Sequence, residues 1–139
     1  MNPVVHPYLN YGGNCREAFT FYADHLGGKV LAMMAHSQAP PGTPNMGAAP
    51  ESIMYAQLQI GDSHIMGSDA PAYQPMRSAY LMYGVHSNEE AERAYKLLTE
   101  GGVVFMEMQE TFFAHRFAML RDRFGTSWMI IHGKQPPAA

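Results

Sequence analysis

Asn14-Cys15-Arg16-Glu17 and Ser87-Asn88-Glu89-Glu90 are two stretches with the same design, and together they decide the fold. Each places a side-chain oxygen where a helix begins and a glutamate three residues later, which pairs the free amides of the first helical turn. Each predicted helix closes on two glycines, at 27–28 and 101–102, where a left-handed residue is favoured. The chain therefore contains one helical design twice.

Short apolar strands flank both predicted helices. They are expected at 4–10, 29–34, 53–60 and 63–67 in the first copy, and at 79–85, 103–108, 115–121 and 127–131 in the second. The order β-α-β-β-β occurs twice. The sequence thus predicts an α+β fold in which two βαβββ modules in tandem form a curved, mostly antiparallel sheet with a cleft. Two copies favour paired modules, because a solenoid needs at least about three units.

Proline and glycine mark the expected boundaries inside a single domain, 1–139. Module one spans 4–69, a proline-containing linker spans 70–78, module two spans 79–132, and 133–139 is a frayed tail. A further stretch, 36–51, carries four prolines and two glycines and is too rich in breakers to form a helix or strand. It is a candidate lid, and a plain solvent-exposed loop is the alternative.

Composition excludes several classes of partner. The 139 residues carry a formal charge of −3 with nine Lys and Arg, so no basic stripe is available for nucleic acid or an acidic membrane. No apolar run approaches the ~20 residues of a membrane span. The single cysteine, Cys15, is interpreted as a small apolar filler, which fits a reducing compartment and a cytoplasmic protein. The twelve methionines indicate either loose core packing or an adaptable pocket.

Three motifs give the chain a family resemblance. They are His6-Pro7-Tyr8-Leu9-Asn10-Tyr11-Gly12-Gly13-Asn14-Cys15-Arg16-Glu17-Ala18, then Phe21-Tyr22 with Leu26-Gly27-Gly28, and Glu110-Thr111-Phe112-Phe113 leading to Asp122-Arg123-Phe124-Gly125 and Trp128-Met129-Ile130. With these, the chain resembles the vicinal oxygen chelate superfamily, which contains glyoxalase I, bleomycin-resistance proteins and extradiol dioxygenases, and within it the PhnB-like group. The resemblance implies a glyoxalase-like fold and a homodimer.

The chain also departs from that group. Phe113 stands where the group typically has tryptophan, and Ala118 stands where glycine is common, so the surface of the second hairpin differs. Some members are labelled as ubiquinone-pathway methyltransferases. A methyl-donor domain of that kind needs a doubly wound sheet and a glycine-rich turn, which the predicted modules do not offer.

In metal-using relatives, the resemblance implies ligands on the first and last strands of each module. His6 matches such a position, whereas Tyr80 and Met129 stand where a histidine and a glutamate are expected. Overlaying the two hairpins at their glycines places Ile65 opposite Met129. One histidine with a phenol, a thioether and a hydrocarbon side chain suits a divalent cation poorly. We therefore expect no strong metal site and no cofactor, with His6 only a weak candidate ligand. His64 is next to Ile65, and a one-residue shift in register would turn it toward His6.

The expected ligand-binding surface is apolar and aromatic with a few polar tips, as in small-molecule pockets. Arg116 is the candidate for a carboxylate or phosphonate, and a surface arginine is the alternative. No catalytic residue is identified. We expect a protein that binds a small aromatic or amphiphilic molecule in the cleft, and a divalent-metal-dependent lyase, isomerase or dioxygenase is the alternative. The residues expected to bind the ligand are His6, Tyr8, Tyr80, Met82, Phe113, Arg116 and Met129.

Overall fold

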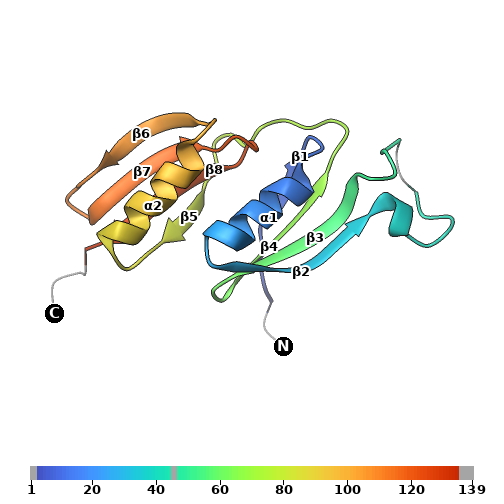
Figure 1. Cartoon of the computed structure of the whole chain (residues 1–139), viewed down its shortest axis with the longest axis horizontal. Coiled ribbons are helices and arrows are strands. Elements are labelled where there is room, and N and C mark those ends of the chain that lie inside the picture. The colour runs from blue at the N-terminus through green and yellow to red at the C-terminus, as the bar shows by residue number, and fades with distance from the viewer. Residues whose placement is uncertain (1–2, 45–46, 135–139) are drawn as a thin grey trace. The chain divides into compact units, whose positions relative to one another are not determined.

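The computed structural model of the chain describes residues 3–44 and 47–134, and Figure 1 labels its elements. The chain divides into two compact units, Met1–Gln74 and Pro75–Ala139, here called unit one and unit two. Each unit is described by itself. The larger part of the predicted tail, 135–139, lies outside the described residues.

Unit one folds as a four-stranded sheet with one long helix. Its elements are β1 (Tyr8–Tyr11), α1 (Cys15–His25), β2 (Gly28–Ala35), the short 3-10 helix η1 (His36–Gln38), β3 (Ile53–Ile60) and β4 (Ser63–Asp69). The strand order is β1-β4-β3-β2, with β1 parallel to β4 and the other pairs antiparallel. The first strand begins at Tyr8 and not near residue 4, and the preceding Pro7 has no N–H to donate to a sheet.

Unit two repeats this plan. Its elements are β5 (Leu81–Gly84), α2 (Asn88–Thr99), β6 (Val103–Gln109), β7 (Ala114–Arg121) and β8 (Ser127–Gly133). The order is β5-β8-β7-β6, again with the first strand parallel to the last. The predicted tandem βαβββ fold is confirmed. Each copy forms its own mixed four-stranded sheet, because the first strand of the unit joins the outer side of its last strand.

Each helix covers one face of its own sheet (Figure 1). In unit one, Ala18, Phe19 and Tyr22 of α1 are fully buried, as is Leu58 on the facing side of the sheet. In unit two, Ala91, Ala94 and Leu98 of α2 face a layer of buried side chains formed by Leu120, Trp128 and Ile130. The face of each sheet that points away from α1 or α2 is here called the open face. Neither helix of the described chain is long and apolar enough to cross a membrane.

The two helix starts, which look alike in sequence, differ in structure. Ser87 caps α2 as predicted, since its Oγ accepts the Glu90 N–H at 3.1 Å. The prediction for Asn14 was wrong, because its side chain makes no capping hydrogen bond. Asp69, at the end of β4, supplies the cap of α1, and its Oδ1 accepts the N–H groups of Gly13 and Cys15, both at 3.0 Å. A neighbouring carboxylate suits the positive end of the helix better than a neutral amide.

Candidate functional site

Four methionines, one from each strand, lie side by side across the open face of unit two. Met106 pairs with Met119 across β6 and β7. Met129 in β8 pairs with both Met119 and Met82. Directly paired residues point to the same side of a sheet, and the alternate positions carry the residues buried under α2. We call Met82, Met106, Met119 and Met129 the methionine row. Met82 is 62% exposed and the other three are half-buried.

An aromatic and cationic cluster lies in unit two along one side of the methionine row. The rings of Tyr80 and Phe105 meet edge to face with centroids 6.3 Å apart. The guanidinium carbon of Arg121 lies 5.8 Å from the centroid of Phe105. Tyr80 was predicted from the sequence, whereas Phe105 and Arg121 were missed. For Arg121 the alternation of β7 was the available signal, because it lies two positions after Met119 and therefore on the same face.

On the other side of the row lies a pair of phenylalanines. Phe117 pairs with Ile131 on the open face and is only 6% exposed. Phe113 precedes β7, and its ring meets that of Phe117 at 5.0 Å, edge to face. Phe113, predicted as a ligand contact, therefore adjoins the open face, while its neighbour Phe112 projects outward with 92% exposure.

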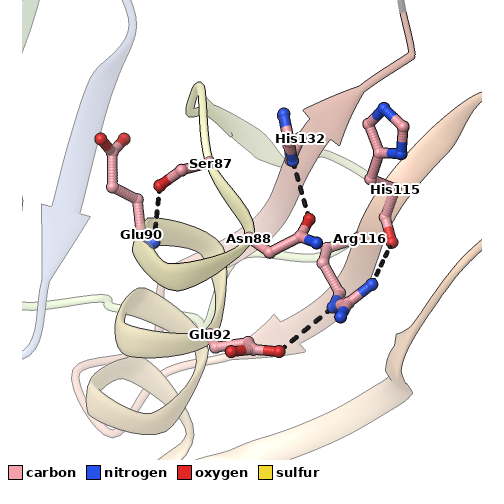
Figure 2. Close-up of polar contacts among 7 residues, drawn as sticks. All are labelled: Ser87, Asn88, Glu90, Glu92, His115, Arg116 and His132. Atoms are coloured by element: carbon pink, nitrogen blue, oxygen red, sulfur yellow. Dashed lines mark hydrogen bonds and ion pairs between the residues drawn. The ribbon is translucent and has the colours of Figure 1, made fainter.

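Arg116 lies on the opposite side of the same sheet, as Figure 2 shows. Its Nε donates to Glu92 of α2 at 3.2 Å, and its Nη1 donates to the carbonyl of His115 at 2.8 Å. The structure thus places Arg116 under the helix and apart from Tyr80, Met82 and Met129. The alternation explains this placement, since Arg116 precedes the open-face residue Phe117.

A hollow of about 890 Å³ lies beside this helix-side cluster, with three imidazoles, of His86, His115 and His132, in its lining. The His132 ring is held by Asn88 of α2, whose side-chain oxygen accepts from Nδ1 at 2.8 Å (Figure 2). The one lysine in the lining, Lys134, is already paired with Glu110 at 2.9 Å, which lowers the pKa of that glutamate. The cations around this hollow thus have carboxylate partners and offer little attraction for an added anion.

On the open face of unit one, four side chains form a connected polar group. The rings of His6 and His64 lie 5.6 Å apart. Gln57 donates through Nε2 to His64 Nδ1 at 2.9 Å, and the Tyr55 hydroxyl donates to Gln57 Oε1 at 3.0 Å. Tyr8, another predicted contact, belongs to the same face and is 53% exposed.

The predicted overlay of the hairpins was wrong for Ile65, which faces α1 and is 6% exposed, while His64 takes the open face. The lengths of the two turns explain the difference. Only Gly61 and Asp62 separate the paired residues Ile60 and Ser63, whereas 122–126 separate Arg121 and Ser127. Turns that differ by an odd number of residues put corresponding positions on opposite faces.

These residues do not fit a divalent metal site. Gln57 occupies Nδ1 of His64, so Nε2 is the ring nitrogen of His64 left for a cation. In unit two, the open face offers a phenol and thioethers. Across residues 3–44 and 47–134, no group of three or more His, Cys, Asp or Glu is placed to hold a metal ion.

Comparisons with known proteins give a consistent picture. The family model described as 3-demethylubiquinone-9 3-methyltransferase matches residues 3–131. Protein YjdN of Escherichia coli (strain K12) is 33% identical over 141 residues, which cover 94% of this chain and 96% of YjdN.

Solved structures show the same fold. Protein PA1353 from Pseudomonas aeruginosa has a TM-score of 0.83 and 39% identity, covering 94% of this chain and 97% of that chain. A glyoxylase/bleomycin resistance protein/dioxygenase domain from Frankia sp. EAN1pec has a TM-score of 0.61 and 16% identity, covering 96% and 99% of the two chains. Both described sheets are mixed and carry one helix each. A typical methyltransferase domain that binds a methyl donor has a doubly wound sheet instead. The family model and the relatives place this chain in the family described as 3-demethylubiquinone-9 3-methyltransferase, and its fold is that of the glyoxalase/bleomycin-resistance proteins.

Proposed function

We propose that this protein binds a small aromatic or amphiphilic molecule, without a strong metal site, and that the methionine row on the open face of unit two is the main contact surface. The observation that carries the proposal is the in-register row itself, flanked by Tyr80 and Phe105 on one side and Phe117 on the other. Methionine side chains adapt to irregular apolar shapes, and each sulfur–aromatic contact contributes roughly 0.3–1.5 kcal/mol.

Methyl NMR tests this proposal directly. The protein is labelled at the methionine methyl groups, and 2-naphthol, a neutral aromatic probe, is added. We expect shifts concentrated on the four methionines of the row. The other eight of the twelve serve as internal references. No probe-dependent shift at any row methionine, in a panel that also includes longer amphiphiles, would overturn the proposal.

A pair of variants supplies a matched control. Met82→Ser removes an exposed thioether of the row, and Met34→Ser removes one that is 37% exposed on β2 of unit one. We expect the rise in melting temperature caused by 2-naphthol to shrink in Met82→Ser and to persist in Met34→Ser. Equal losses in both variants would argue against a contact surface on unit two. His6 and Tyr8 remain predicted ligand contacts, and His6→Ala tests them in the same assay.

The alternative function is a divalent-metal-dependent lyase, isomerase or dioxygenase. The 5.6 Å approach of His6 and His64 favours it, and the thioethers of the methionine row in unit two, which are poor ligands for such cations, oppose it. Elemental analysis of the purified protein separates the two functions. Near-stoichiometric Ni, Zn, Fe or Mn that is lost in His6→Ala would replace our proposal with the alternative.

We further propose a homodimer and a cytoplasmic location. The dimer rests on the family resemblance and on the edge strand β6, where Val103, Val104 and Phe105 are each at least 40% exposed. Exposed edge strands in proteins are usually paired or protected. Sedimentation as a monomer at micromolar concentration would refute the dimer. The location rests on the lone Cys15 thiol, and localisation by microscopy tests it.

A further inference from the structure

We infer that the ligand of unit two carries a carboxylate, and that Arg121 binds this group while the apolar body lies on the methionine row. This inference rests on the proposed function, and it adds the charge and the orientation of the ligand. It also moves the anion-binding role from Arg116, a candidate from the sequence, to another arginine of the same strand.

The position of Arg121 supports this role. It ends β7 on the open face, two residues after Met119. Two residues of strand correspond to about 7 Å, so a cation and an apolar contact are spaced to suit a molecule with one or two rings. The stacking of its guanidinium on Phe105 limits the conformations of a long side chain, which reduces the entropy lost on binding.

The charge around Arg121 is not neutralised from within the described residues. The ion pairs of the neighbouring cations Arg116 and Lys134 are made with Glu92 and Glu110, and neither pair involves Arg121. The adjacent carboxylate, Asp122, is buried and accepts N–H groups of its own turn and of Trp128. Arg121 therefore forms no ion pair in the described part of the chain, although it is half-buried.

The chemistry of the pair Arg121 and Tyr80 selects a carboxylate. A guanidinium presents a planar fork that matches a carboxylate with two parallel hydrogen bonds. Tyr80 contacts the same Phe105 ring, so its phenol belongs to the same cluster as the guanidinium. A phenol adds a neutral donor without a competing negative charge. A cation beside partly exposed thioethers thus suits an amphiphilic anion better than a neutral aromatic molecule.

Two probes that differ only in charge test the inference in the wild-type protein. 2-Naphthoate carries the carboxylate, and 2-naphthamide is a neutral molecule of nearly the same shape. We expect 2-naphthoate to bind at least tenfold more tightly by calorimetry, with an advantage that shrinks as salt increases. Equal affinities would overturn the inference and leave the proposed function standing, whereas no binding of either probe or of the longer amphiphiles would overturn both.

Variants of the two arginines of β7 then test which arginine binds the carboxylate. Arg121→Gln is expected to remove the preference for 2-naphthoate and to leave 2-naphthamide binding unchanged, which also shows that the variant folds. Arg116→Gln is the matched control and should keep the full preference, because Arg116 faces α2. Arg121→Lys, which keeps the charge but loses the fork, should retain part of the preference. Loss of the preference in Arg116→Gln, with Arg121→Gln unaffected, would overturn the assignment.

Discussion

The indole N–H of Trp128 donates to the carboxylate of Asp122 at 2.9 Å inside unit two. The second carboxylate oxygen accepts the N–H groups of Phe124 and Thr126, at 2.9 and 3.0 Å. Asp122 is 5% exposed and Trp128 is 2% exposed. One buried carboxylate therefore shapes the β7–β8 turn and orients the largest side chain of the core.

Asp122→Ala should destabilise the protein by roughly 3 kcal/mol, because three donors lose a charged acceptor in a buried place. Urea unfolding measures the loss. The control is Asp62→Ala in the exposed β3–β4 turn, which we expect to change the free energy of unfolding by less than about 0.5 kcal/mol. Similar losses at the two turns would contradict the role of the buried carboxylate.

The start of α1 gives a second prediction. Asp69→Ala should cost about 2 kcal/mol of unfolding free energy, since the carboxylate caps the helix and also accepts the Ile53 N–H at 2.9 Å. Asn14→Ala should be neutral or stabilising, although asparagine at a helix start normally caps. The Oδ1 atom of Asn14 is buried without a hydrogen-bond partner, and its removal relieves a desolvation penalty. A large loss in Asn14→Ala would show that its side chain caps α1 after all.

Local patterns predicted most of the fold because they report local forces. The alternation of β3 and the glycines that close both helices depend on neighbouring residues only. Gly27 and Gly101 have φ of +73° and +74°, as their positions after a helix require. The prediction of the α1 cap was wrong for the opposite reason. Asp69 is more than fifty residues from Cys15, and no residue near Asn14 in the sequence indicates that Asp69 caps the helix.

The candidate site was only partly predictable, for a similar reason. Tyr80, Met82 and Met129 followed from strand alternation within single strands. The methionine row requires the register of all four strands, and the proposed role of Arg121 requires the register shift between Val104 and Met106, where Phe105 lies. Register and bulges depend on turn length and pairing across the sheet, which one sequence does not specify.

The buried thiol of Cys15 gives a pH-dependent prediction. Burial, with a smaller effect of Asp69, raises its pKa from 9.0 to about 12. The unfolded chain therefore loses this proton first, and stability falls as pH rises above about 9. Urea unfolding between about pH 8 and pH 10.5 should show a steeper loss in the wild type than in Cys15→Ala. Parallel pH profiles would contradict a buried neutral thiol.

The same burial should protect the Cys15 thiol from reaction with disulfide reagents. A thiol that stays protonated reacts slowly with disulfide reagents, because the thiolate is the nucleophile. At pH 8, labelling of the native protein should be slow and should accelerate sharply in denaturing urea. Fast labelling of the folded protein would show that the side chain is accessible.

Two glycines of unit two test the closeness of backbone packing. A Cβ added at Gly102 would collide with the carbonyl oxygen of Arg121, whereas one added at Gly84 would meet nothing within 4 Å. A backbone atom cannot move aside as a side chain can, so Gly102→Ala should cost roughly 1–3 kcal/mol. Gly84→Ala, at the end of β5, should leave the free energy of unfolding nearly unchanged. Because Arg121 sits at the displaced backbone, Gly102→Ala should also weaken the preference for 2-naphthoate. If Gly102→Ala matched Gly84→Ala in both stability and ligand preference, the close approach of the two backbones would be refuted.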